Sequence, residues 1–142
     1  MVYTIYNKGG NMRDYNHLLI NARIENSIID KRQAVNFLNN LVHDLNMKSV
    51  SEPSVNYIEK TGVRGIFGSI VVEDGHMTFH ILDEKNPAIM QFDLYIYADL
   101  PLSSVMYNLG KYFDVIYLDY ALINREIDIR IRAHGRITNK KD

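Results

Sequence analysis

The apolar residues of the chain follow two periods, and each period predicts one type of element. After Asp30, a residue suited to cap a helix, apolar residues recur three or four positions apart for about 15 residues. The residues of this stripe are Ala34, Val35, Leu38, Leu41, Val42 and Leu45. The same spacing of Val105, Leu109 and Tyr112 predicts a second amphipathic helix over 102–113.

Elsewhere apolar residues alternate with polar ones, which is typical of strands. In the segment 76–82, Met77, Phe79 and Ile81 fall on one face, and the polar residues between them fall on the other. The predicted strands are 17–22, 50–57 (weakened by Pro53), 66–72, 76–82, 91–97, 115–123 and a final exposed strand through Ile127, Ile129 and Ile131.

The resulting order of elements, one strand, a helix, four strands, a helix and two strands, predicts an α+β fold. We expect a two-layer sandwich in which both helices cover one face of an antiparallel sheet. A single domain is expected over 16–133, with a flexible leader at 1–15 and a tail at 134–142.

The composition narrows the possible classes of function. The chain has 142 residues and no cysteine, which excludes disulfides, thiolate zinc sites and a thiol nucleophile. Its 16 Lys and Arg against 17 Asp and Glu give a net charge of −1, so the usual electrostatic attraction to nucleic acids or anionic membranes is missing. No apolar run approaches the ~20 residues of a membrane span, and the polar N-terminus lacks the apolar stretch of a signal peptide. We therefore expect a cytoplasmic protein with neither nucleic-acid nor membrane partners.

His76 and His80 stand four positions apart, a spacing that suits a metal site when both residues lie on a helix. On the predicted strand the two side chains are about 13 Å apart, which is too far to share one ion. No metal site is therefore predicted. The alternative for both residues is an ordinary histidine of a sheet surface.

The segment 60–69 is rich in glycine, but it has neither the spacing of a P-loop nor that of a dinucleotide-binding loop. Its one unusual residue is Arg64, which stands in a short stretch bounded by two glycines. An arginine at such a loop end can bind a carboxylate or phosphate through two parallel hydrogen bonds. The alternative is a solvated side chain with no such role.

Asp93, Tyr95 and Tyr97 share one face of the predicted strand 91–97. If this strand pairs with 76–82, the three residues form one polar wall with the polar residues of that strand. Aromatic faces beside a carboxylate suit a cationic or planar ligand. The alternative is a solvated sheet face on which tyrosines favour strand formation.

The run GHMTFHILDEKNPAIMQFDLYIYADL, residues 75–100, resembles the core motif of the prokaryotic-type S-adenosylmethionine decarboxylases. That motif has the form Ser-His-x-x-x-His-x-Trp-x-Glu, followed by an apolar strand ending in Asp-x-x-x-Cys-Gly. His76, His80 and Glu84 match its first part, and Asp93 matches the acid of its second part.

Two further segments extend the resemblance over residues 15–125, which is most of the chain. Gly62-Val63-Arg64-Gly65 resembles the Gly-Val-x-Gly of the family, and His17-Leu18-Leu19 resembles its first strand. The resemblance implies a decarboxylase-like sandwich that assembles into a homo-oligomer, either a dimer or a trimer.

Departures from the family pattern change the chemistry that the resemblance implies. The family converts its motif serine into a pyruvoyl group, and Gly75 stands at that position. Tyr97 replaces the cysteine of the family, Arg64 its processing serine and Leu82 its tryptophan. Because glycine has no hydroxyl to attack the backbone, we expect no pyruvoyl cofactor.

These departures lead to the hypothesis of a non-pyruvoyl enzyme that acts on S-adenosylmethionine or a nucleotide-conjugated derivative. We expect a lyase that releases 5′-methylthioadenosine and homoserine lactone, since a sulfonium is already a good leaving group and needs no electron sink. The expected catalytic residues are Asp93, Tyr97 and His80, and the expected substrate-binding residues are Arg64, His76, Glu84 and Tyr95.

Two alternatives to the lyase stay open. One is a catalytically inactive decarboxylase paralogue that binds S-adenosylmethionine or a polyamine and regulates an active partner. The other is a small-molecule sensor unrelated to S-adenosylmethionine.

Overall fold

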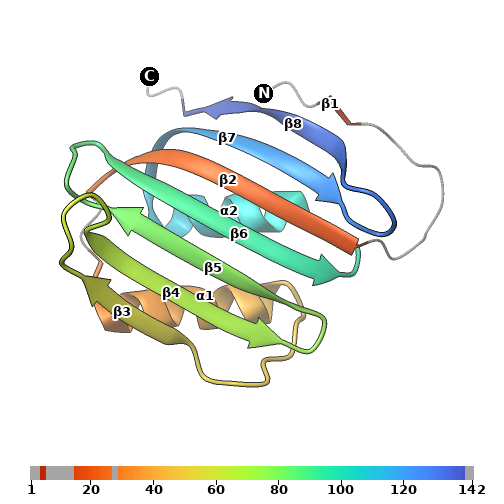
Figure 1. Ribbon diagram of the computed structural model, residues 1–142, viewed down its shortest axis with the longest axis horizontal. Coiled ribbons are helices and arrows are strands. Elements are labelled where there is room, and N and C mark those ends of the chain that lie inside the picture. The colour runs from red at the N-terminus through yellow and green to blue at the C-terminus, as the bar shows by residue number, and fades with distance from the viewer. Residues whose placement is uncertain (1–3, 6–14, 27–28, 140–142) are drawn as a thin grey trace.

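The computed structural model describes residues 4–5, 15–26 and 29–139. Across these residues, eight strands form one antiparallel sheet in the order β1-β8-β7-β2-β6-β5-β4-β3 (Figure 1). The strands are β1 (Thr4–Ile5), β2 (Tyr15–Glu25), β3 (Ser54–Ile58), β4 (Gly65–Val72), β5 (Gly75–Leu82), β6 (Ala88–Tyr97), β7 (Asp114–Asn124) and β8 (Arg130–Thr138). The helices are α1 (Lys31–Asp44) and α2 (Leu102–Tyr112).

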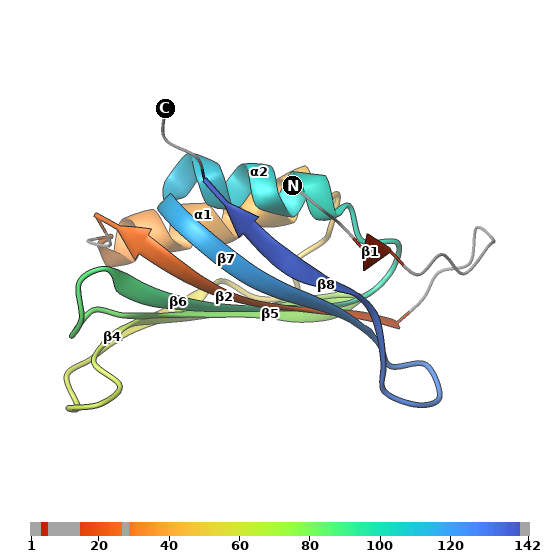
Figure 2. The same ribbon diagram turned by 90° about the horizontal axis from the view of Figure 1, so that it is seen from above.

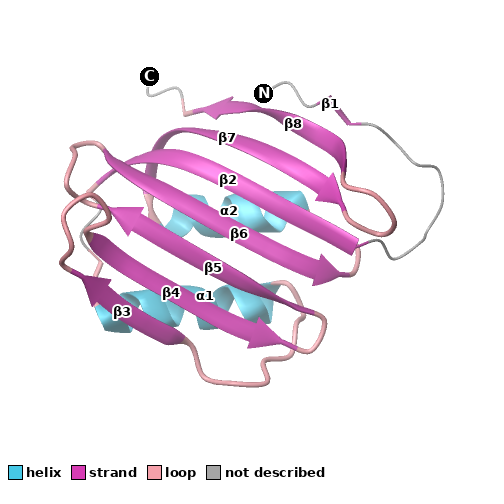
Figure 3. Cartoon of the chain, viewed as in Figure 1, coloured by secondary structure: helices cyan, strands magenta, loops and turns pink. Residues whose placement is uncertain are grey.

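Both helices lie on one side of the sheet, so the fold has two layers (Figure 2 and Figure 3). α1 contacts β3 and β4, whereas α2 contacts β7. The core between the layers centres on Phe37 of α1, whose ring centroid lies 5.6 Å from that of Phe79 and 6.3 Å from that of Phe92. The predicted two-layer α+β architecture is confirmed. Neither of the two described helices is long and apolar enough to cross a lipid bilayer.

The helix α1 begins where its local sequence predicts. Oδ1 of Asp30 accepts a hydrogen bond from the Gln33 N–H at 2.8 Å, and Oε1 of Gln33 accepts one from the Asp30 N–H at 2.9 Å. This reciprocal capping box satisfies the N–H groups of both residues. The N–H of Gln33, in the first turn, would otherwise have no partner within the helix. The apolar stripe faces the sheet, with Leu38 and Leu41 fully buried. The prediction of this helix is confirmed.

The strand β2 lies in the middle of the sheet, between β6 and β7, although it comes early in the sequence. Its residues Leu18 and Ile20 are buried under the helices, so the residues that alternate with them project from the opposite side of the sheet. We call this opposite side the outer face. Among the described residues it carries no helix, and the β3–β4 and β7–β8 loops reach beyond it (Figure 2).

The C-terminal part of the sheet differs from the prediction. β8 begins at Arg130, so Ile127 and Ile129 lie in the β7–β8 loop, with exposed fractions of 90% and 76%. The predicted strand is wrong at its start, because alternation makes a strand only where a neighbouring strand pairs with it. β8 then continues to Thr138 and pairs with β7, so residues 134–138 belong to the sheet and not to a tail.

The expected leader 1–15 is described only in part. Thr4–Ile5 forms β1, which pairs with β8, and Tyr15 is the first residue of β2. Residues 1–3 and 6–14, like residues 140–142 of the expected tail, lie outside the described residues.

Candidate functional site

Three neighbouring strands bring polar and aromatic side chains together on the outer face. In one cross-strand row, His76 of β5 pairs with Tyr95 of β6, which pairs in turn with His17 of β2. In the next row, Thr78 of β5 pairs with Asp93 of β6. Side chains that are directly opposite on one face of a sheet lie within contact distance. The polar wall predicted from the pairing of these two strands is therefore present.

The rings of this wall pack against one another. The ring centroid of His17 lies 5.9 Å from that of Tyr95 and 6.5 Å from that of His76, and those of His76 and Tyr95 are 5.6 Å apart. Arg125, at the start of the β7–β8 loop, lies over Tyr95, with its Cζ atom 4.8 Å from the ring centroid. We call His17, His76, Asp93, Tyr95 and Arg125 the outer-face site.

His17 lies between the two charged residues of the outer-face site. Its Nδ1 atom is 3.3 Å from Nη1 of Arg125, and its Nε2 atom is 3.6 Å from Oδ1 of Asp93. A guanidinium only donates hydrogen bonds, so Nδ1 must accept, and we assign the ring proton to Nε2 on this geometry. That proton points toward Asp93, at a distance longer than a normal hydrogen bond.

The neutral form of His17 is favoured. Burial lowers the pKa of His17 from its usual value, Asp93 opposes this shift without reversing it, and the charges of Arg125 and His76 lower the pKa further. Only 20% of the His17 side chain is exposed, so solvent offers little compensation for a charge on the ring. Protonation of the ring would also place an N–H donor on Nδ1, where it would face the N–H donors of Arg125.

Asp93 is the half-exposed carboxylate of the site, with 43% of its side chain exposed. Its Oδ2 atom lies 3.4 Å from the Thr78 hydroxyl, and no described lysine or arginine pairs with it. Asp119, on β7, differs because Arg136 donates to both of its oxygens, at 2.7 and 3.0 Å. The hydrogen bond from Arg136 lowers the pKa of Asp119. Of these two carboxylates, Asp93 is the one without a guanidinium partner.

A depression of about 390 Å³ lies beside Asp93 and opens on the outer face. Its lining comes from β6, β2 and β7 and includes Leu19, Gln91 and Ala121. Both Asp93 and Asp119 border it. The volume is within the range of small-molecule sites, and the acidic border suits a cationic ligand.

Tyr97 extends the aromatic surface of the site. It lies two residues beyond Tyr95 on the same face of β6, and its ring stacks on that of Tyr15 at 4.4 Å with an interplanar angle of 28°. The structure therefore brings Asp93, Tyr95, Tyr97 and His76 of the predicted site to one surface.

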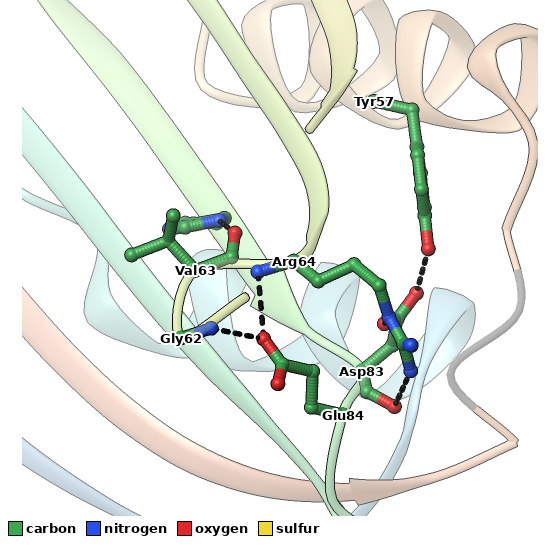
Figure 4. A network of polar contacts seen from close by, with 7 residues as sticks. Tyr57, Gly62, Val63, Arg64, Asp83 and Glu84 are labelled. Carbon is green, nitrogen blue, oxygen red and sulfur yellow. Dashed lines mark hydrogen bonds and ion pairs between the residues drawn. The ribbon is translucent and has the colours of Figure 1, made fainter. Parts of the chain in front are cut away.

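Arg64 and Glu84 belong to a different network, at the β3–β4 loop (Figure 4). Nε of Arg64 donates to Oδ1 of Asp83 at 2.8 Å, while the Tyr57 hydroxyl donates to the other oxygen of Asp83 at 2.6 Å. Oε1 of Glu84 accepts hydrogen bonds from the N–H groups of Gly62 at 2.6 Å and Arg64 at 3.1 Å. Asp83 thus neutralises the guanidinium that the sequence pattern offered to a ligand anion.

His80 joins this loop network as well. Its Nε2 atom lies 3.1 Å from the carbonyl oxygen of Val63, and four positions along β5, or about 13 Å, separate it from His76. These contacts hold the β3–β4 loop against the loop that follows β5. Arg64, Glu84 and His80 therefore lie in a loop-ordering network and not in the outer-face site.

His17 and Arg125 belong to the outer-face site but are not among the site residues predicted from the sequence. His17 falls within a predicted strand, but only the register of β2 against β6 shows that it faces Tyr95 and Asp93. Arg125 follows the end of β7, where no periodicity indicates the direction of a side chain.

Neither the protein-family models nor the curated proteins contain a match to this chain. The resemblance to the decarboxylases therefore rests on the residues that carry it, and one of them can be examined directly in the structure.

Gly75 stands where the decarboxylases carry their pyruvoyl-forming serine, and it packs directly against β6. A Cβ atom on Gly75 would lie 1.8 Å from the carbonyl oxygen of Tyr95 and 2.7 Å from its carbonyl carbon. Any larger residue, serine included, would force the two strands apart. The residues present do not fit a pyruvoyl group at this position, and the chemistry has to come from other groups.

Proposed function

We propose that the protein is a lyase that splits S-adenosylmethionine, or a nucleotide-conjugated derivative of it, into 5′-methylthioadenosine and homoserine lactone at the outer-face site. The proposal rests on the position of Asp93, a carboxylate that no described guanidinium pairs with, beside the rings of Tyr95 and His17 and next to a depression of ligand size. A sulfonium attached to a planar adenosyl group matches a carboxylate among aromatic rings.

The proposed reaction needs positioning and no nucleophile from the protein. A carboxylate oxygen of the substrate attacks its own γ-carbon, the bond from that carbon to sulfur breaks, and the electron pair of that bond stays on sulfur. The sulfonium becomes a neutral thioether and the carboxylate becomes the lactone ester, so charges balance without a proton transfer. A site that holds the methionyl chain in the folded form supplies most of the rate increase.

Asp93 acts in this proposal through the charge of the sulfonium. A carboxylate near the sulfonium stabilises the bound substrate more than the transition state, in which the positive charge is already decreasing. We therefore assign Asp93 to binding. The rings of Tyr95 and Tyr97 position the adenosyl part, and the neutral His17 adds no positive charge beside the sulfonium.

We further propose that a second copy of the chain covers the outer face in a cytoplasmic homo-oligomer, a dimer or a trimer. The exposed apolar side chains of this face include Leu19, Phe67, Val71 and Ile131. Burying them between subunits would stabilise the assembly and exclude water from the reacting centre.

The test of the proposed function is incubation of the purified protein with S-adenosylmethionine, with products separated by chromatography and identified by mass spectrometry. We expect 5′-methylthioadenosine and homoserine lactone to form in equal amounts, and calorimetry to detect binding of S-adenosylmethionine. Binding without products would support the regulatory paralogue in place of the lyase. No binding of S-adenosylmethionine or of its nucleotide-conjugated derivative at millimolar ligand would contradict the lyase.

A further inference from the structure

Arg125 holds its guanidinium over the outer-face site in a fixed position. Its backbone N–H donates to the carbonyl oxygen of Tyr15 at 2.9 Å, which ties the start of the β7–β8 loop to β2. Its side chain turns back over the sheet, where Cζ lies 4.8 Å from the Tyr95 ring centroid and Nη1 lies 3.3 Å from Nδ1 of His17. Stacking on an aromatic ring fixes the plane of a guanidinium and leaves its edge for hydrogen bonds.

None of the described neighbours of Arg125 neutralises its charge. Within the described ranges, Arg64 pairs with Asp83 and Arg136 pairs with Asp119, but no described carboxylate pairs with Arg125. Its contacts are with a neutral imidazole and an aromatic ring. A guanidinium has five N–H donors, and His17 accepts only one of them, so the geometry leaves donors for an anion.

We propose that Arg125 binds the carboxylate of the methionyl part of the substrate, so that the outer-face site selects a zwitterionic adenosyl sulfonium. This inference rests on the proposed function and assigns one end of the substrate to each charged residue. Arg125 and Asp93 contact opposite nitrogens of the His17 ring. A carboxylate and a sulfonium in S-adenosylmethionine are likewise separated by a short three-carbon chain. Arg125 therefore takes the anion-binding role that the sequence pattern gave to Arg64.

The proposed contact has a defined effect on the reaction. Arg125 holds one carboxylate oxygen and leaves the other to attack the γ-carbon. Cyclisation consumes the carboxylate charge, so the ion pair with Arg125 is stronger in the bound substrate than in the transition state. Removal of Arg125 weakens the ion pair of the bound substrate and also removes a contact that positions the attacking carboxylate. It should therefore raise KM by a larger factor than it lowers kcat.

The experiment compares three ligands by calorimetry: S-adenosylmethionine, decarboxylated S-adenosylmethionine and 5′-methylthioadenosine. The second keeps the sulfonium and lacks only the carboxylate, and the third lacks the whole amino-acid chain. We expect the wild-type protein to bind S-adenosylmethionine about tenfold more tightly than the decarboxylated form. Arg125→Ala should abolish this preference by weakening only the S-adenosylmethionine complex, and Arg125→Lys should retain part of it.

Arg130→Ala is the matched control, because Arg130 lies in the same hairpin and pairs with Asp128. We expect it to leave all three affinities unchanged, and thermal unfolding of each variant verifies the fold. Equal weakening of all three complexes by Arg125→Ala, or no weakening, would overturn the inference while leaving the proposed function intact. If the wild-type protein binds none of the three ligands, the proposed function fails, and the inference fails with it.

Discussion

Nδ1 of His17 lies 3.3 Å from Nη1 of Arg125, so the imidazole ring has to stay unprotonated on the side that faces this guanidinium. The opposite nitrogen points toward Asp93 at 3.6 Å. One neutral ring therefore separates a cation from an anion on the surface where the ligand is proposed to bind. The protonation state of His17 therefore determines its contacts with both Arg125 and Asp93.

Lowering the pH should destabilise the protein through His17. The usual pKa of histidine is 6.5, and in the folded protein burial lowers the pKa of His17, with Arg125 and His76 acting in the same direction and Asp93 against it. The unfolded chain then takes up this proton at a higher pH than the folded chain does. The contribution of His17 to the free energy of unfolding is fully present above about pH 6.5 and decreases as the pH falls toward the folded pKa. Denaturant unfolding in steps below neutral pH measures this decrease, and His17→Gln should remove it.

The charged groups that face His17 should move its pKa in opposite directions. Arg125→Ala should raise the pKa of His17, because the variant removes a positive charge beside the ring. Asp93→Asn should lower it further. The imidazole resonances of His17 in NMR titrations report both shifts. Neither variant substitutes His76 or Tyr95, the other two residues that contact the ring. A pKa of His17 that responds to neither substitution would contradict the contacts of its ring with Arg125 and Asp93.

Asp93→Asn should weaken the binding of S-adenosylmethionine by about tenfold and change kcat at saturation less than that. The reason is that its charge stabilises the bound sulfonium more than the transition state. Steady-state kinetics and calorimetry on the same preparations separate the two effects.

Asp119→Asn is the control for this substitution, because Asp119 borders the same depression but is neutralised by Arg136. We expect it to alter affinity much less than Asp93→Asn does. Equal effects of the two variants would show that the depression attracts cations in general and that Asp93 has no particular place in it.

Gly75→Ser should destabilise the fold by about 2 kcal/mol and should not produce self-cleavage. A Cβ atom at this position meets the backbone of Tyr95, so the two strands have to separate to accommodate it. The wild-type chain and the variant should both have the intact mass near 16.5 kDa. Gly110→Ser is the control, because a Cβ atom at Gly110 has nothing within 4 Å. A cleaved chain in either preparation would overturn the exclusion of a pyruvoyl group.

Arg64→Ala should lower the unfolding temperature and leave the affinity for S-adenosylmethionine unchanged. Arg64 holds the β3–β4 loop through Asp83, and Asp83 in turn binds the hydroxyl of Tyr57. Tyr57→Phe removes another hydrogen bond of the same network and should act in the same direction. Reduced affinity in Arg64→Ala with unchanged stability would instead support a substrate-binding role for Arg64.

Local patterns predicted the parts of the fold that depend on neighbours in sequence. The capping box that begins α1 joins Asp30 and Gln33, three positions apart, and the alternation of β5 is complete within eight residues. The local pattern gave a wrong prediction at Ile127 and Ile129. Both alternate with polar residues as in a strand, but they lie in a loop that no described neighbouring strand pairs with.

The candidate site depended on contacts between distant parts of the chain, and these could be predicted only in part. The pairing of β5 with β6 brings Asp93 and Tyr95 to His76 as the alternation indicated. The insertion of β2 between β6 and β7 adds His17 and Arg125 to this surface, and no local period specifies that insertion.

An isotope experiment distinguishes intramolecular cleavage of S-adenosylmethionine from its hydrolysis. The reaction is run in water enriched in heavy oxygen, and the products recovered at early times are quantified by mass spectrometry. We expect 5′-methylthioadenosine and homoserine lactone in equal amounts, with no heavy oxygen in the lactone. Homoserine that carries heavy oxygen from the start would show hydrolysis by water, and no release of 5′-methylthioadenosine would show that the protein is not this lyase.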